Sequence, residues 1–225
     1  MAEALSAKIS IIDYGMGNLR SVQKALERVG AQAEVITTPE AAKGSAGLVL
    51  PGVGAFGQAM EQLTKDGFDG LVREWVAADR PFLGICLGLQ LLFSESEEFG
   101  PVKGLDVVRG RVVRFAGPAY EAHDGEPGLK VPHMGWNSLT VIKTHPVIAG
   151  VPEGAMAYFV HSFYCVPSDP GWTAVTADHG QDFTAAIAGG NLFASQFHPE
   201  KSGAVGLMML TNFVAMVGAF AKRGA

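Results

Sequence analysis

Cys86 lies between two glycines, in the run PFLGICLGLQLLF that spans residues 81–93. Gly84 and Gly88, two residues on either side, permit a sharp turn from a strand into a helix, in which a nucleophilic side chain projects outward. The dipole and the free N–H groups of the following helix favour a thiolate over a thiol, and the thiolate is the reactive form. The alternative is a small apolar residue in a core strand, the commoner fate of a free cysteine. This segment alone leaves both interpretations open.

A cysteine nucleophile needs a base, and the base needs an orienting partner. The segment His198-Pro199-Glu200 offers both, directly after an apolar run, residues 192–197, that is typical of a strand. His198 is therefore expected at the end of a strand, where open α/β sheets hold their sites. If the extended geometry continues, the side chains of His198 and Glu200 project to the same side. Taken alone the segment also fits a surface loop, but the two motifs together favour a Cys, His and Glu site.

The third requirement is a place for the negative oxygen of a tetrahedral intermediate. Pro51-Gly52-Val53-Gly54 follows a strand ending at Leu50, and amides flanked by glycines can turn their N–H groups into a pocket. This cluster, like Gly15-Met16-Gly17 after the first strand, also fits a tight turn or a phosphate loop. Neither has the G-x-G-x-x-G or Walker spacing, so nucleotide binding is not favoured.

The elements that position these residues alternate in the first half of the chain. Apolar periodicity predicts strands at 8–13, 33–36, 47–50 and 82–85. Helices are predicted at 18–29, within 56–78 and at 87–93. This alternation predicts a three-layer α/β fold, with a mostly parallel central sheet and helices on both faces.

The second half of the chain changes to short alternating runs that predict an antiparallel extension of the same sheet. These runs cover residues 107–115, 136–142, 156–160, 173–177 and 185–196, the last with a hairpin turn at 189–191. Residues 117–130 are polar and rich in Gly and Pro, which indicates a mobile surface loop. Residues 203–222 are expected to form a helix that docks on the sheet.

Composition narrows the class of protein. With 225 residues, 48% of them apolar, the chain is expected to form one domain over residues 1–225. A net charge of -5, with 17 scattered Lys and Arg residues, argues against binding to nucleic acid. We identify no signal peptide and no membrane span, and the two cysteines and six histidines show no zinc spacing. We therefore expect a cytoplasmic protein with no membrane contact, no metal and no cofactor.

The chain resembles the class I glutamine amidotransferases in its two chemical motifs, GICLGLQ at 84–90 and FHPE at 197–200. It resembles most closely the glutaminase subunits of imidazole glycerol phosphate synthase, over about residues 9–213. The motifs that carry this closer resemblance are IDYGMGNL at 12–19, PGVGAF at 51–56, PHMGWN at 132–137, FVHSFY at 159–164 and SQFHPEKS at 195–202.

The resemblance implies hydrolysis of glutamine to glutamate and ammonia through a cysteine thioester. It makes Cys86 the nucleophile, His198 the acid and base, and Glu200 the group that orients His198. The residues that it assigns to the oxyanion and to glutamine are Gly52, Val53, the amide of Leu87, and Gln90.

A partner also follows from the resemblance: a (β/α)8-barrel cyclase that uses the ammonia to form imidazole glycerol phosphate, in histidine biosynthesis. The isolated chain should be nearly idle until this partner binds with its own ligand. The docking residues implied by family position are Met134, Trp136, Asn137 and Tyr158. For Trp136 and Tyr158, ordinary core burial is the alternative.

Three other functions fit parts of the pattern. The first is the glutaminase of another amidotransferase, such as anthranilate synthase, with the same Cys, His and Glu. The second is a cysteine hydrolase of peptides or esters, although papain-like signatures are absent. The third is a non-catalytic flavodoxin-like module in which Cys86 is incidental.

The remaining cysteine and histidines receive structural interpretations. Cys165 has neither flanking glycines nor an obvious base. His133 and His161 lie in family motifs and could line the docking region, but nothing in the sequence makes them catalytic. The histidines expected in loops are His123, His145 and His179.

Overall fold

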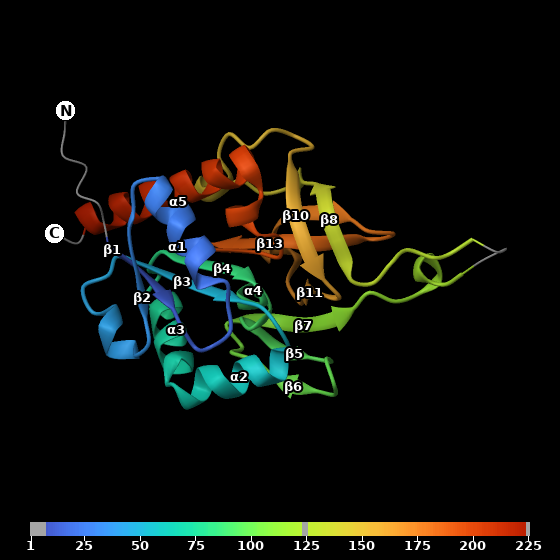
Figure 1. Ribbon diagram of the computed structural model, residues 1–225, viewed down its shortest axis with the longest axis horizontal. Helices are drawn as coiled ribbons and strands as arrows, with labels where there is room; N and C mark the ends of the chain where they lie inside the picture. Colours follow the sequence, from blue (N-terminus) through green and yellow to red (C-terminus); the bar gives the residue numbers. More distant parts are fainter. Residues whose placement is uncertain (1–7, 123–125, 224–225) are drawn as a thin grey trace.

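The computed structural model describes residues 8–122 and 126–223. A large mixed sheet runs through the middle of the molecule, and helices cover both of its faces (Figure 1). Its strands follow the order β2-β1-β3-β4-β14-β13-β11-β7-β5-β6, and β12 and β9 extend it from β13. This confirms the three-layer α/β fold.

The parallel half of the sheet carries the two chemical motifs. Its strands are β1 (Lys8–Ile12), β2 (Gln32–Ile36), β3 (Gly47–Gly52), β4 (Phe82–Cys86) and β14 (Leu192–Ser195). β4 lies between β3 and β14 and is parallel to both. Because β4 ends at Cys86 and β14 ends three residues before His198, the two motifs leave the sheet at the same edge.

Two helices pack on each face of the sheet. The long helices are α1 (Leu19–Arg28), α2 (Phe56–Lys65), α3 (Phe68–Ala77) and α5 (Gly203–Arg223). One core cluster joins Leu26 of α1 and Phe213 of α5 to the sheet, and the other joins Phe56 of α2 and Trp75 of α3 to it. The helix predicted at the C-terminal end therefore docks as expected. Short 3-10 turns occur at Pro39–Ala42, Pro118–Tyr120, Pro146–Ile148, Pro170–Trp172 and Pro199–Lys201.

The second half of the chain extends the sheet with antiparallel strands, as predicted. The strands added here are β7 (Val108–Arg114), β9 (Thr140–Val141), β11 (Phe163–Pro167), β12 (Thr173–Asp178) and β13 (Asp182–Gly189). β13 and β14 form the hairpin around residues 189–191. Residues 117–122 and 126–130 project away from the body between β7 and the next strand (Figure 1).

Two parts of the prediction were wrong. The runs at 136–142 and 156–160 do not all join the large sheet, because β8 (His133–Ser138) and β10 (Met156–His161) pair only with each other. The helix predicted at 87–93 ends at Gln90, as α4 (Leu87–Gln90). The chain then returns to the sheet as β5 (Phe93–Ser96), next to β7 and the short β6 (Val102–Lys103).

The expectation of no membrane span needs a correction at α5. By length and apolar composition alone, this helix of 21 residues could cross a membrane. It buries Leu210, Phe213 and Val217, and Phe213 and Val217 are fully buried. A core helix passes the same test of length and composition, because a helix packed on a sheet also needs an apolar face.

Candidate active site

Cys86 lies at a strained turn between β4 and α4. Its backbone has φ 55°, which is rare for a residue with a side chain and costs about 1–3 kcal/mol. The flanking glycines make the turn possible: a Cβ at Gly88 would overlap the carbonyl oxygen of Leu50, and one at Gly84 would lie 2.8 Å from the Cβ of Ala194. The Cys86 side chain is 7% exposed and faces a cavity. The elbow inferred from the two glycines is confirmed.

The helix after Cys86 is shorter than predicted, and this weakens one argument from the sequence. α4 has four residues, so few peptide dipoles are aligned behind its first N–H groups. The helix therefore favours a thiolate less than a helix over residues 87–93 would. Its start still places Leu87 next to Cys86 and buries Gln90 near the turn.

His198 and Glu200 form a buried pair. The two side chains are 2% and 1% exposed, and His198 Nδ1 lies 2.8 Å from Glu200 Oε1. The extended geometry considered in the sequence analysis continues only as far as His198, because residues 199–201 form a 3-10 turn that begins at Pro199. The contact is nevertheless made: His198 is itself extended, with φ -98° and ψ 96°, and Glu200 reaches its ring from the second position of the turn.

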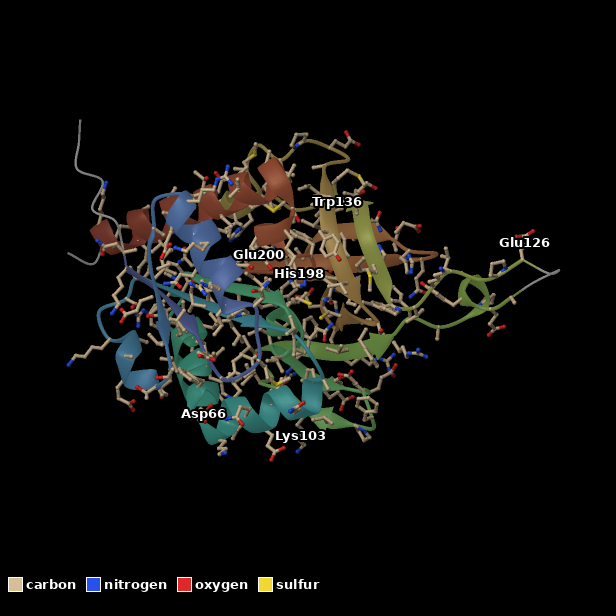
Figure 2. All side chains as sticks on the ribbon, viewed as in Figure 1. Asp66, Lys103, Glu126, Trp136, His198 and Glu200 are labelled. Atoms are coloured by element: carbon tan, nitrogen blue, oxygen red, sulfur yellow. The ribbon has the colours of Figure 1, made fainter. Side chains whose placement is uncertain are left out.

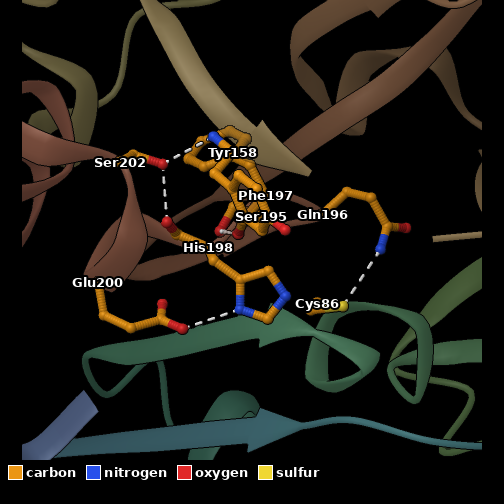
Figure 3. A network of polar contacts seen from close by, with 8 residues as sticks. All are labelled: Cys86, Tyr158, Ser195, Gln196, Phe197, His198, Glu200 and Ser202. Carbon is orange, nitrogen blue, oxygen red and sulfur yellow. Dashed lines mark hydrogen bonds and ion pairs between the residues drawn. The ribbon is translucent and has the colours of Figure 1, made fainter. Parts of the chain in front are cut away.

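The protonation of His198 depends on its neighbours. Burial alone would lower the pKa of His198, but the Cys86 thiolate and the Glu200 carboxylate raise this pKa to about 9. At neutral pH the imidazole is therefore protonated. Figure 3 shows its ring between Glu200 and Cys86. Nε2 is directed toward Cys86 (Figure 3), which accounts for the effect of the thiolate on the pKa, but it has no hydrogen-bond partner of normal geometry among the described residues, so it can give its proton to a bound molecule.

The end of β3 and the residue that follows it lie next to the elbow. Gly52 is paired with Cys86 in the β3–β4 register. A Cβ at Gly52 would overlap the hydroxyl of Tyr14 and lie 3.0 Å from the Cβ of Leu87, so only glycine fits. The Tyr14 hydroxyl donates to the carbonyl of Pro51 at 3.0 Å, and burial raises the pKa of this phenol. Val53, 40% exposed, lines the cavity beyond Gly52.

A cavity of about 410 Å³ brings the sequence-predicted residues together. Cys86, Leu87, Gln90, Val53 and His198 all line it. Gly52 and Glu200 do not line the cavity but contact residues that do. The lining residues that the sequence analysis did not assign to the catalytic or glutamine-binding groups are Gly54, Glu98, Pro132, Val160, His161, Ser162 and Phe163, although Gly54 belongs to the glycine cluster considered for the oxyanion.

The residues that were missed came with different signals. His161, Ser162 and Phe163 lie in the motif FVHSFY, but this motif does not indicate which of its side chains face the cavity. Glu98 lies in a polar turn with no motif, and its carboxylate accepts from the N–H of Phe56 at 2.7 Å. Nothing local in the sequence indicates that this turn reaches the cavity.

The residues expected to dock a partner lie on the separate β8–β10 sheet. Met134 is 63% exposed and Trp136 54% exposed, which excludes core burial for Trp136 in the chain alone. Tyr158 and Asn137 are partly buried, and the rings of Trp136 and Tyr158 meet edge to face at 6.2 Å. Figure 2 shows Trp136 on this sheet, apart from His198 and Glu200.

The other cysteine and the histidines fit their structural interpretations in part. Cys165 is 1% exposed, and burial raises the pKa of its thiol, which makes it inert. His145 and His179 lie outside the strands and α-helices as expected, and His123 lies outside the described residues. Among residues 8–122 and 126–223, no cluster of Cys, His, Asp and Glu is arranged to hold a metal ion.

Comparison with known proteins defines the family. The family model for glutamine amidotransferase class-I matches residues 10–217. The chain is 55% identical to the imidazole glycerol phosphate synthase subunit HisH of Syntrophotalea carbinolica, over 91% of this chain and 98% of the relative. It is 51% identical to the HisH subunit of Geobacter sulfurreducens, over 93% of this chain and 99% of the relative.

A solved structure gives the same fold at low identity. The structure of PurLQS from Thermotoga maritima has a TM-score of 0.69 and 16% identity. The match covers 96% of this chain and 100% of the PurLQS chain. The family match and the close relatives carry the assignment, and the shared fold agrees with it. The chain is a glutamine amidotransferase of class I and belongs, within that class, to the family of HisH subunits of imidazole glycerol phosphate synthase.

Proposed function

We propose that this chain hydrolyses glutamine at Cys86 and delivers the ammonia to a cyclase partner that forms imidazole glycerol phosphate in histidine biosynthesis. The observation that carries the chemical part is the buried His198–Glu200 pair beside the strained Cys86 elbow, on one cavity. The names of the close relatives support the pathway.

In the first step Cys86 is the nucleophile and His198 the acid. The thiolate of Cys86 attacks the side-chain amide carbon of glutamine, a C–S bond forms, and the carbonyl electron pair moves to oxygen. His198, protonated because the pKa of its imidazole is raised to about 9, gives a proton to the leaving nitrogen. The C–N bond breaks, ammonia leaves and a thioester remains. The unpartnered Nε2 of His198 is the atom available for this transfer.

In the second step His198 is the base. It is neutral after giving up its proton, so it can take a proton from water as the water oxygen attacks the thioester carbon. The C–S bond breaks, glutamate leaves, and Cys86 and His198 return to the thiolate and imidazolium. Glu200 keeps Nδ1 of the ring directed away from the substrate in both steps.

The loop after β3 and the start of α4 would hold the oxyanion and the substrate. Gly52 packs against Leu87, and Val53 lines the cavity, so backbone N–H groups from both segments can converge on the amide oxygen. Gln90 lines the same cavity and is 6% exposed, which suits a group that holds the glutamine.

The partner we propose is a (β/α)8-barrel cyclase that docks on Met134, Trp136, Asn137 and Tyr158. Exposed Trp and Met side chains are typical of interface anchors, and Trp136 is exposed in the chain alone. We further propose that the chain folds as one domain and needs no cofactor. It forms a heterodimer with this cyclase in the cytoplasm, and the heterodimer catalyses a lyase reaction. A glutaminase for anthranilate synthase is not favoured, because the close relatives are named HisH subunits.

Release of glutamate from glutamine tests this proposal. The purified chain should release little glutamate alone, and much more with the cyclase and its ribotide ligand, whereas the complex with Cys86→Ala should release none. High activity of the chain alone, with no stimulation, would retain the chemistry and reject the partner. A correctly folded complex without activity would reject the chemistry as well.

A further inference from the structure

The carbonyl oxygen of Phe163 is the centre of a buried polar network beside the cavity. It lies 2.8 Å from His161 Nδ1 and accepts from Gln90 Nε2 at 3.1 Å. A carbonyl oxygen only accepts hydrogen bonds, so His161 must carry its proton on Nδ1 and Gln90 must turn its amide nitrogen toward Phe163. One backbone oxygen thus sets the direction of two side chains.

The first arm of the network runs from Phe163 to the nucleophile. The second N–H of Gln90 donates to Gln196 Oε1 at 3.0 Å. Gln196 therefore presents its oxygen to Gln90 and its nitrogen to Cys86, with 3.7 Å between Nε2 and Sγ, a distance suited to sulfur (Figure 3). Gln196 is fully buried, so water does not compete for this donor.

The second arm runs outward to β8. With its proton on Nδ1, neutral His161 has a free electron pair on Nε2, and His133 Nδ1 lies 3.2 Å away and donates to it. His133 Nε2 then accepts from Asn137 Nδ2 at 3.3 Å. The second N–H of Asn137 donates to the carbonyl of Asp178 at 2.6 Å. In each hydrogen bond of this arm, the donor and the acceptor are therefore fixed.

Both histidines are held neutral, as this direction requires. Burial, followed by the neighbouring His179, lowers the pKa of His133 to about 4. Burial is also the main reason that the pKa of His161 falls to about 3. A protonated His161 would have no electron pair for His133, and the outward arm would break.

We propose that Gln196 is a further catalytic residue, which donates its side-chain N–H to the Cys86 sulfur, and that His161 is a positioning residue, which donates to the Phe163 carbonyl and so holds in place the oxygen that orients Gln90 and, through it, Gln196. A donor at the sulfur favours the thiolate and holds it toward the cavity. A flipped Gln196 amide would place its oxygen against the thiolate, and the contact with Gln90 prevents this flip. The inference rests on the proposed role of Cys86 as nucleophile.

The variant Gln196→Met tests the donor. Methionine keeps the length of the side chain and removes the N–H, and Gln181→Met is the matched control, because Gln181 donates to Tyr164 and does not contact Cys86. The measurement is the rate of iodoacetamide alkylation at pH 7 in the cyclase complex, with Cys86→Ala as the background from Cys165. We expect alkylation to slow by about tenfold or more in Gln196→Met and to change by less than about twofold in Gln181→Met.

Steady-state kinetics on the same complexes add a second readout. For Gln196→Met the kcat for glutamate release should fall by about tenfold or more, with KM within about threefold, because the lost contact is to the nucleophile. Wild-type rates of both alkylation and glutamate release in a folded Gln196→Met complex would overturn the inference. An inactive wild-type complex would instead reject the proposed function, so the two failures are distinguishable.

His161→Asn and His161→Leu test the positioning role. Asparagine can place its amide nitrogen near the position of Nδ1 and restore the donor to Phe163, whereas leucine cannot. We expect slow alkylation in His161→Leu and partial recovery in His161→Asn. In the wild-type protein, ¹⁵N NMR should show His133 and His161 as neutral Nδ1–H tautomers. Equal alkylation rates in both variants, or Nε2–H tautomers, would overturn the positioning role.

Discussion

At the scale of single residues, the site depends on backbone crowding as much as on reactive side chains. Cys86 has a positive φ, and Gly84, Gly88 and Gly52 surround it at positions where a Cβ would meet other atoms. Because these three residues carry no Cβ, β3, β4 and α4 can pack closely around the sulfur. Reactivity at Cys86 therefore depends on residues that carry no chemistry of their own.

A pair of glycine substitutions tests this crowding. Gly88→Ala should lower the free energy of unfolding by about 3 kcal/mol or more, because the new Cβ would overlap the Leu50 carbonyl. Gly70→Ala is the control: Gly70 lies in α3 with open space around it, and alanine should raise stability by about 0.5–1 kcal/mol. Urea unfolding measures both, and similar values for the two variants would contradict the account of the elbow.

The Glu200 carboxylate gives a prediction about pH. His198 must be protonated to release ammonia, so partner-stimulated kcat/KM should fall as pH rises through about 9 in the wild type. Glu200→Gln removes one cause of the raised pKa, so this loss should move to lower pH, and kcat should fall by about 100-fold or more. A pH–rate profile whose alkaline limb stays in place in the variant would show that Glu200 does not act on His198.

At the scale of elements, the separate β8–β10 sheet connects an exposed face to the buried site. Its strands carry His133 and His161, which contact each other across the pair, and Trp136 on the outward side. The same small sheet therefore presents apolar side chains to solvent and polar ones to the cavity. These two surfaces lead to separate predictions.

The buried histidines should make the fold sensitive to acid. The pKa of His161 is lowered to about 3 in the folded chain. Below pH 6.5, the ordinary pKa of a histidine, the unfolded chain therefore binds a proton at His161 that the folded chain does not bind. The free energy of unfolding should therefore decrease as the pH is lowered from 6.5 to about 3, by up to about 1.4 kcal/mol per pH unit from His161. Urea unfolding of wild type and His161→Leu should show the shallower dependence in the variant. Parallel curves would mean that His161 is protonated in the folded state.

The outward face of the sheet gives a prediction about binding. Trp136→Ala should raise the Kd for the cyclase by about 30-fold or more, as expected for a hot-spot tryptophan. It should change the Tm of the chain by only about 2 °C, because Trp136 is 54% exposed. Ile142→Ala, at a residue of 57% exposure outside the proposed docking set, is the matched control. Equal Kd values for the two variants, measured by calorimetry, would place the interface elsewhere.

At the scale of the whole molecule, the sheet order makes the site. Cys86 and His198 are 112 residues apart, and they meet because β14 inserts next to β4 and leaves the sheet at the same edge. The alternation of strands and helices predicted this parallel half, because its periodicity is local. The motifs predicted which residues would meet there.

The parts that the sequence did not predict depend on long-range pairing. β8 pairs only with β10, and after α4 ends at Gln90 the chain pairs as β5 with β7; both pairings join segments that are separated in the sequence. Glu98 reaches the cavity from a turn without a motif. The role of His161 depends on tautomers, and these are set by a carbonyl that no local pattern identifies.

The most direct test of the central claim is to trap the thioester. The cyclase complex with its ribotide ligand is mixed with labelled glutamine, quenched in acid during turnover and mapped by peptide mass spectrometry. The account predicts a γ-glutamyl adduct on Cys86, none on Cys165, and none in the Cys86→Ala complex. Glutamate release without any adduct on Cys86, or undiminished release by the Cys86→Ala complex, would contradict it.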